Sequence, residues 1–376
     1  MRLWLNAHIA LKMLETPSAY DISTDELYEL DDEGFMFLQS CASTDGAESR
    51  NREFTDYCLE EGILTTERVS ARRPPIEQSP EPSLRYLELQ ITRRCNLRCA
   101  HCYIGPHAED ELSRETVRSV LAEFERMQGL RLLLTGGEPL LHREFKAINR
   151  MLPEFALRTV LFTNGHLLSD KVLGSLNAHE IQVSIDGIEE GHDMLRGKGS
   201  YKTALDAIRR ALDRGLEVSV STMVHPGNLE DLEKMDELFR SMEIRDWTVD
   251  VPCLEGNLRE NPEHSLEPAV AGKYLSYGYG GAMHAGGPGY ACGRHLMSVM
   301  ADGSAAKCAF YADSPAGNIR EGLAGCWGRV PHYRLDELEC DCEFLEECRG
   351  GCRYRAKTLG SETQRDLYRC VLYGKI

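Results

Sequence analysis

The chain has 376 residues and a formal net charge of −17 at pH 7, from 43 lysines and arginines against 60 aspartates and glutamates. This length predicts two or three domains, and the acidic balance disfavours non-specific binding to nucleic acids or membrane surfaces. No apolar run is long enough to span a bilayer, and polar residues interrupt any signal-peptide core, so we expect a cytoplasmic protein without a membrane partner.

Residues 1–68 form the first predicted unit, and the proline-rich stretch 69–83 is predicted to be an extended linker. The predicted elements of the unit are strands at 9–15 and 25–32 and helices at 32–42 and 51–61, the second ended by Gly62. Cys41 and Cys58 lie on the apolar faces of these helices, so we expect buried packing thiols there and not metal ligands.

Strand and helix patterns alternate through residues 84–255. The predicted strands are 83–92, 130–137, 158–165, 181–187, 217–225 and 246–252, and the predicted helices are 113–129, 143–155, 167–179, 200–215 and 228–242. Alternation of this kind predicts a parallel sheet, either open and doubly wound or closed into a full or partial barrel. In both folds the chemistry lies at the carboxyl ends of the strands, where this sequence places its glycines and polar residues.

After residue 255 the periodicity ends, and a glycine-rich stretch leads into clustered cysteines. Fourteen cysteines are many for a reducing compartment, where clustering indicates metal binding and not disulfides. The first group is Cys95, Cys99 and Cys102. The second group is Cys292, Cys308, Cys340, Cys342, Cys348, Cys352 and Cys370.

The first cysteine group directly follows the first strand of the alternating region, in the stretch CNLRCAHCY. Three thiolates on one loop can hold three irons of a four-iron cluster and leave the fourth iron open for a substrate or cofactor. A zinc site completed by His101 is the alternative, although zinc sites are usually built from paired Cys-x2–4-Cys units. Similarly, the second group could form one four-cysteine zinc site with three cysteines left over.

The order of motifs resembles that of the radical S-adenosylmethionine (SAM) enzymes: CxxxCxxC, then GGEP at 136–139, SIDG at 184–187 and HDMLRGKGSY at 192–201. The resemblance covers residues 84–255 and implies a partial (β/α)6 barrel. It also implies a [4Fe–4S] cluster on the first cysteine group, whose open iron binds SAM. One electron from such a cluster cleaves SAM to a 5′-deoxyadenosyl radical, which abstracts a hydrogen atom from the substrate.

The same resemblance implies the SAM-binding residues Tyr103, Gly136, Gly137, Glu138, Pro139, Asn164, Ser184, Asp186 and Arg196. Glu138 would accept hydrogen bonds from the SAM ammonium, beside glycines that allow close backbone approach. Ser184 and Asp186 would face the ribose, and the Arg196 guanidinium would bind the SAM carboxylate. Asn164 would line the same pocket or serve only as a turn residue before a glycine. Tyr103 would pack over the cluster or the adenine edge.

Residues 292–370 resemble the SPASM extension of radical SAM enzymes, which carries two auxiliary [4Fe–4S] clusters. We therefore expect a C-terminal domain at residues 256–376 that consists largely of loops and holds the two auxiliary clusters. By the resemblance the near cluster takes Cys292, Cys308 and Cys352, and the distal cluster takes Cys340, Cys342, Cys348 and Cys370. Only one residue separates Cys340 from Cys342, where the family has two, and this departure could reshape the distal cluster.

The near cluster lacks a fourth ligand in the stretch before Cys292. Cys253, Cys326, a non-cysteine side chain or a substrate group could supply it, while either cysteine could instead be an unligated buried thiol. We expect an open site that binds a substrate thiol.

The N-terminal unit resembles the winged-helix domains that bind the leader of a ribosomally made precursor peptide by adding it as a strand to a sheet edge. A cap without a ligand is the alternative. The whole chain is accordingly predicted to be a peptide maturase, with thioether formation at a cysteine the preferred reaction and carbon–carbon crosslinking next. A flavodoxin or ferredoxin would donate the electron.

Other predicted functions are formylglycine formation as in anaerobic sulfatase maturation, a small-molecule reaction such as one on tetrapyrroles, and a non-catalytic iron–sulfur scaffold. The sequence names no catalytic base.

Overall fold

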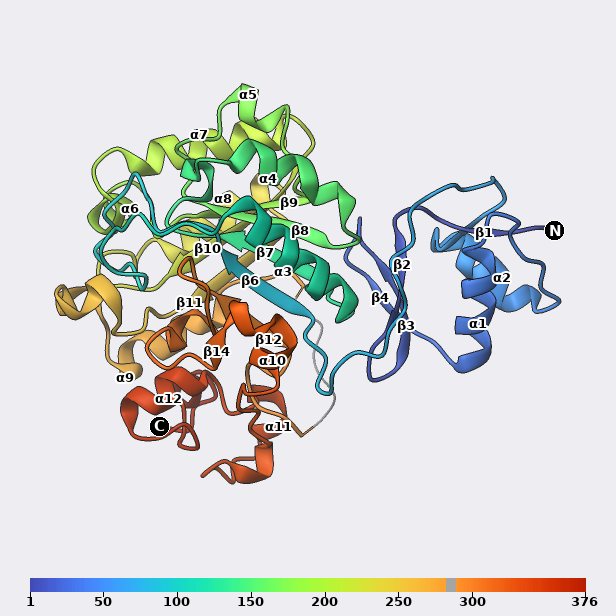
Figure 1. The fold of residues 1–376 in the computed structure, drawn as a ribbon. Helices are drawn as coiled ribbons and strands as arrows, with labels where there is room; N and C mark the ends of the chain where they lie inside the picture. The colour runs from blue at the N-terminus through green and yellow to red at the C-terminus, as the bar shows by residue number, and fades with distance from the viewer. Residues whose placement is uncertain (282–288) are drawn as a thin grey trace.

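The computed structural model describes residues 1–281 and 289–376. Figure 1 shows a small N-terminal domain at the right of a larger α/β domain, with the C-terminal part of the chain packed below that domain. In the described part of the chain, no helix is long and apolar enough to cross a membrane.

The N-terminal domain is a three-stranded antiparallel sheet with two helices packed on it. Its elements are β1 (Trp4–Leu5), β2 (Ile9–Met13), β3 (Pro17–Asp21), β4 (Leu27–Glu29), α1 (Asp32–Cys41), α2 (Arg52–Glu60) and β5 (Leu64–Thr65). The sheet order is β2-β3-β4, and β1 pairs separately with β5. Cys41 and Cys58 are 1% and 0% exposed in its core, which confirms them as packing residues. The sequence analysis missed β3, because proline and small residues give its stretch a weak strand pattern.

Six parallel strands form the central sheet of the α/β domain. They are β6 (Tyr86–Gln90), β7 (Arg131–Thr135), β8 (Arg158–Thr163), β9 (Glu180–Ser184), β10 (Glu217–Met223) and β11 (Asp246–Asp250). They lie side by side in chain order, without the reversal that defines a doubly wound sheet. The predicted partial barrel is therefore confirmed, and the doubly wound alternative is wrong.

Helices cover the outer face of this sheet. They are α3 (Arg114–Arg126), α4 (Phe145–Met151), α5 (Asp170–Leu173), α6 (Glu190–Arg196), α7 (Ser200–Leu212) and α8 (Leu232–Ser241). Leu87 and Leu89 of β6 pack with Phe124 of α3 in one buried core, so the other face of β6 lines the barrel interior. The helix predicted at 167–179 is only the four residues of α5, and α6 was not predicted.

The C-terminal part extends the barrel sheet, which the sequence analysis did not foresee. Its strands are β12 (Leu296–Val299), β13 (Ser304–Ala306) and β14 (Gly317–Asn318), and its helices are α9 (Pro268–Ala271), α10 (Leu323–Trp327), α11 (Leu345–Cys348), α12 (Arg353–Leu359) and α13 (Leu367–Leu372). Strand β12 pairs in parallel with β6, and β13 and β14 continue the sheet antiparallel. The barrel and the C-terminal part therefore share one sheet.

The N-terminal domain contacts the amino ends of the barrel strands. The buried Lys12 ammonium donates to the carbonyl of Gly129, at 2.7 Å, just before β7. Arg158, the first residue of β8, donates to the carbonyl of Ser23 at 2.6 Å, and Arg131 of β7 forms an ion pair with Asp25. The domain thus lies opposite the carboxyl ends of the strands, where a barrel places its chemistry.

Candidate active site at the carboxyl end of the barrel

The cysteine loop, residues 95–102, follows β6 and rests on the GGEP segment after β7. Gly137 N donates to the carbonyl of Thr92 at 2.7 Å, and Glu138 N to that of Arg94 at 2.8 Å. A Cβ on Gly137 would lie 2.5 Å from the Arg94 carbonyl oxygen, which leaves no room for a side chain. Gly137 thus allows the close backbone approach expected of the GGEP glycines, and the segment that approaches it is the entry of the cysteine loop.

Two other segments hold the same loop from its far side. Ala100 N donates to the carbonyl of Leu195 in α6 at 2.8 Å. Asn257, in the 3-10 turn Gly256–Arg259, donates from Nδ2 to the Cys99 carbonyl at 3.0 Å and from its backbone to the Cys102 carbonyl at 2.9 Å. The sequence analysis missed Asn257, which lies in a stretch without periodicity.

Glu138 is fully buried beneath the cysteine loop. Its carboxylate accepts hydrogen bonds from the Thr163 hydroxyl and the Asn164 backbone N, each at 2.9 Å. Glu138 is also the N-cap residue of the 3-10 turn Pro139–Leu141. Burial raises the pKa of Glu138 to about 7, although the hydrogen bonds to its carboxylate act to lower that pKa. Glu138 forms no ion pair with any residue in 1–281 or 289–376, and such a buried carboxylate is suited to an ammonium ligand. The assignment of Glu138 to SAM stays a prediction.

Asn164 and Ser184 lie at neighbouring strand ends. Asn164 Nδ2 donates to Asn96 Oδ1 at 2.9 Å and lies 3.9 Å from Cys95 Sγ, so its side chain touches the cysteine loop and is more than a turn residue. Ser184 ends β9, is partly exposed and pairs in register with Ser221 of β10.

Asp186 faces Arg196, although the sequence analysis had assigned these residues to different parts of SAM. The Asp186 carboxylate is 0% exposed and accepts from Arg196 Nε at 2.5 Å and from Met223 N at 2.8 Å. The pair lowers the pKa of Asp186 and raises that of Arg196, because each charge stabilises the other. Asp186 is therefore better placed to orient Arg196 than to reach a ribose.

Three side chains clamp the backbone of Asp186. His192 Nδ1 accepts from Asp186 N at 3.0 Å, while His225 Nε2 and Asn228 Nδ2 lie 2.9 and 2.8 Å from its carbonyl oxygen. His101 Nε2 lies 3.5 Å from the Asp186 carboxylate, so it faces this pair, and burial lowers the pKa of His101 to about 4. His192 and His225 had no role assigned from the sequence, because single histidines carry little signal, and His101 had been considered there only as a zinc ligand.

Tyr103 reaches into the barrel interior. Its hydroxyl donates to Glu88 at 3.1 Å, and its ring packs edge-on against Phe310 with 5.4 Å between centroids. Glu88 also accepts from Ser298 of β12 at 2.5 Å, and burial raises the pKa of Glu88. Tyr103 therefore ties the cysteine loop to the C-terminal part, and its contact with a cluster or with adenine stays a prediction.

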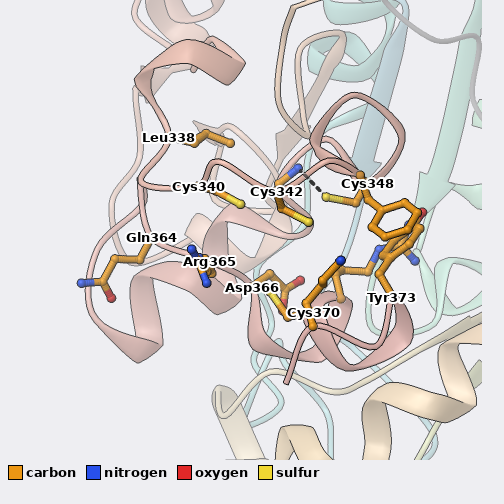
Figure 2. A pocket seen from close by; sticks show the side chains of 13 residues that line it. Leu338, Cys340, Cys342, Cys348, Gln364, Arg365, Asp366, Cys370 and Tyr373 are labelled. Carbon is orange, nitrogen blue, oxygen red and sulfur yellow. Dashed lines mark hydrogen bonds between the residues drawn. The ribbon is translucent and has the colours of Figure 1, made fainter.

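The distal cysteines line one pocket, of about 370 Å³ including space open to solvent (Figure 2). They are Cys340, Cys342, Cys348 and Cys370. Gly350 N donates to Cys348 Sγ at 3.3 Å. The single residue between Cys340 and Cys342 therefore removes neither thiol from the set.

The near cysteines lie apart from that pocket. Cys308 and Cys352 pack in one side-chain cluster, and that cluster also contains Cys253 from the loop after β11. Contact with Cys253 lowers the pKa of Cys352 to about 7. Cys292 is exposed, unlike these three residues, and the neighbouring Cys352 acts to raise its pKa. Cys352 thus groups with the near cysteines, as the resemblance implied.

The cysteine groups fit iron–sulfur clusters by their donor chemistry. All fourteen cysteines are free thiols, and backbone N–H groups point at sulfurs in two groups, as at Cys95, where Leu97 N lies 3.5 Å away. Among residues 1–281 and 289–376, no three His, Cys, Asp or Glu side chains converge around a single ion. The groups offer thiols spread around a space.

Comparison with known proteins matches residues 89–239 to the radical SAM superfamily. A curated relative, Fe-coproporphyrin III synthase of Methanosarcina barkeri, is 24% identical over 75% of this chain and 86% of its own length. The sporulation killing factor maturation protein SkfB of Bacillus subtilis is 30% identical over 40% of this chain and 38% of its own.

The fold is similar to that of Streptococcus suis SuiB, solved bound to the precursor peptide SuiA. The TM-score is 0.69 with 14% identity, over 97% of this chain and 99% of SuiB. The likeness includes the N-terminal domain and the C-terminal cysteine-rich part, and at this identity it describes the fold alone.

Proposed function

Because this chain is a radical SAM enzyme, with its superfamily domain at residues 89–239, we propose that it modifies a ribosomally made precursor peptide whose leader binds the N-terminal domain. The observation that carries the proposal is the open edge of β4. The sheet order β2-β3-β4 leaves this strand without a second partner among the described residues.

The hydrogen-bond pattern of β4 supports strand addition. Leu30 N donates to the Pro17 carbonyl and Asp21 N to the Glu26 carbonyl, so in an antiparallel ladder Leu27 and Glu29 direct their backbone groups away from β3. An extended peptide could pair with these groups. Tyr28 of β4 and the α2 residues Phe54 and Leu59 are partly buried apolar side chains of the same domain, and they would contact alternate residues of the peptide.

SAM bound to the cluster of Cys95, Cys99 and Cys102 would supply the 5′-deoxyadenosyl radical that starts the reaction. Glu138 would hold the SAM ammonium and Arg196, oriented by Asp186, its carboxylate. The radical would act on the peptide inside the barrel, where Ser184 and Ser221 are partly exposed. Thioether formation at a cysteine remains our preferred outcome, with carbon–carbon crosslinking next.

The first test is a search of the neighbouring genes for a short cysteine-rich reading frame, whose peptide product is then used in an anaerobic reaction with SAM and a reductant. Loss of two hydrogens and of one free thiol, read by mass spectrometry, identifies a thioether. Glu29→Pro removes an outward N–H from the β4 edge and should weaken peptide binding by about tenfold, while Glu29→Ala should not. Equal affinity for both variants would contradict leader addition at β4.

A second candidate is a reaction on a tetrapyrrole, favoured by the curated relative that spans three quarters of the chain. Sequence likeness supports this candidate better than the peptide. SAM-dependent change of a propionate-bearing porphyrin, with none of the peptide, would establish the second candidate.

A further inference from the structure

Three near cysteines from distant segments meet in one buried cluster. Cys253 follows β11, Cys308 precedes the 3-10 turn Ala309–Tyr311, and Cys352 precedes α12. Cys253 is 4% exposed. Cys292, the remaining near cysteine, is exposed and lies outside this side-chain cluster. The fold therefore brings Cys253 to two of the three near cysteines that the spacing of the SPASM extension assigned.

We propose that Cys253 is the fourth protein ligand of the near auxiliary cluster, which closes that cluster to substrate. The proposal rests on the radical SAM and SPASM character of the chain, but not on a peptide substrate. It replaces the expectation of an open iron that binds a substrate thiol.

A second observation points to a negatively charged group at this site. Lys307 adjoins Cys308 in sequence and is 4% exposed. Within the described part of the chain, its Nζ has no hydrogen-bond partner and lies over the ring of Tyr333, 4.5 Å from the centroid. A buried ammonium without an acceptor is costly unless an anion lies nearby. Its anionic neighbours are Cys292 and Cys308 and, with a smaller effect, Glu362, which also pairs with Lys357 at 3.8 Å. Thiolates carrying iron would supply the larger part of the negative charge near this ammonium.

Polar groups around Cys253 point the same way. The Tyr311 hydroxyl is buried without a partner among the described residues and belongs to the same side-chain cluster. Arg355, held by Asp250 and Asp366, acts electrostatically on both Cys253 and Cys352. An apolar packing role for Cys253 would leave the Tyr311 hydroxyl without an acceptor.

Cys326 shows what an unligated thiol looks like in this chain. It is 0% exposed and packs in the barrel core beside Leu323 and Trp327. Its polar neighbour is Arg329, 3.7 Å from Sγ, and it belongs to neither cysteine group. Cys326 is therefore the matched control: equally buried, chemically identical and remote from the near site.

The experiment compares wild type, Cys253→Ala, Cys253→Ser and Cys326→Ala in the full chain after anaerobic reconstitution. Iron per chain and the electron paramagnetic resonance (EPR) spectrum of the reduced protein are measured with and without 2-mercaptoethanol. We expect Cys253→Ala either to lose about one four-iron cluster or to keep it with a signal that shifts on adding the thiol. Cys253→Ser, which can ligate through oxygen, should keep the iron and change the signal. Cys326→Ala should match wild type.

Two results would overturn the proposal. One is a Cys253→Ala protein with the iron content, spectrum and thiol response of wild type. The other is a wild-type signal that itself shifts with the thiol, which would show an open near cluster. If the cysteine variants behave as expected but no peptide is modified, the ligand assignment stands and the proposed function fails.

Discussion

Two buried aspartate–arginine pairs stand beside cysteines, one at the barrel end and one in the C-terminal part. In the barrel, Asp186 accepts from Arg196 and from Met223 N. In the C-terminal part, Asp366 accepts from Arg355 NH2 at 2.8 Å and from Cys352 N at 2.8 Å. Both carboxylates are nearly inaccessible, at 0% and 1% exposed.

The two pairs differ in what surrounds them. Asp186 follows β9 and belongs to a domain with one large hydrophobic core. Asp366 precedes the short helix α13, and the side-chain clusters around the C-terminal cysteines are small. A region with little apolar burial needs another source of stability, and metal binding can supply it. The barrel site is therefore shaped by its fold, whereas the C-terminal site depends on its ligands.

The largest expected effect is that of iron removal. Chelation of all iron should leave the barrel strands β6–β11 protected, because their core contains no iron ligand, and should expose the C-terminal segment 337–376. Hydrogen exchange read by mass spectrometry on iron-loaded and iron-free protein measures both regions at once. Equal loss of protection in the two regions would break the comparison.

Single cysteine changes should separate the two sites chemically. Cys99→Ala should abolish 5′-deoxyadenosine formation from SAM, because the cluster of the loop loses one of three ligands. Cys342→Ala, in the distal pocket, should leave that formation measurable and stop peptide modification. Chromatography of 5′-deoxyadenosine and mass spectrometry of the peptide read the two steps separately. A Cys342→Ala protein that modifies peptide normally would contradict a role for the distal cluster.

Removal of one partner from a buried ion pair should lower the free energy of unfolding in both regions. Asp186→Asn should lower the free energy of unfolding by about 3–5 kcal/mol, because Arg196 is then left charged and buried without its partner. Asp366→Asn should lower the free energy of unfolding by a similar amount, but only in iron-loaded protein, where we expect the C-terminal part to be ordered. Asp236→Asn is the control, since its exposed pair with Arg240 contributes about 0–1 kcal/mol. Chemical denaturation measures all three, and an effect of Asp186→Asn no larger than that of the control would contradict the argument.

The sequence predicts the barrel well and the C-terminal part only by its cysteines. The barrel strands alternate regularly with amphipathic helices, and the GGEP and SIDG motifs mark the strand ends. Strand β12 was missed because its four residues, Leu296–Val299, are too few to establish a period. Cys253 was left among several candidates, since only folding brings it to Cys352. Asp186 and Arg196 were both identified, but their mutual pairing is a tertiary contact that no local pattern encodes.

The smallest effect concerns Glu138, whose pKa burial raises from 4.5 to about 7. Between these two pH values the folded protein holds a proton that the unfolded chain releases. Stability should therefore fall as pH rises from about 4.5 to 7, by about 3 kcal/mol in total, and then level off. A SAM ammonium bound at Glu138 would favour the ionised carboxylate and oppose this loss.

Glu138→Gln removes the titration while keeping an acceptor for Thr163 and the Asn164 backbone. Between pH 4.5 and 7 the free energy of unfolding of wild type should therefore fall by about 3 kcal/mol relative to that of Glu138→Gln. The variant gains in relative stability as the pH rises. The control Glu154→Gln changes an exposed carboxylate paired with Arg118 and should run nearly parallel to wild type. Denaturant titrations of SAM-free protein at several pH values give these differences. Parallel curves for wild type and Glu138→Gln would show that the carboxylate is ionised in the folded barrel, already balanced by a cation.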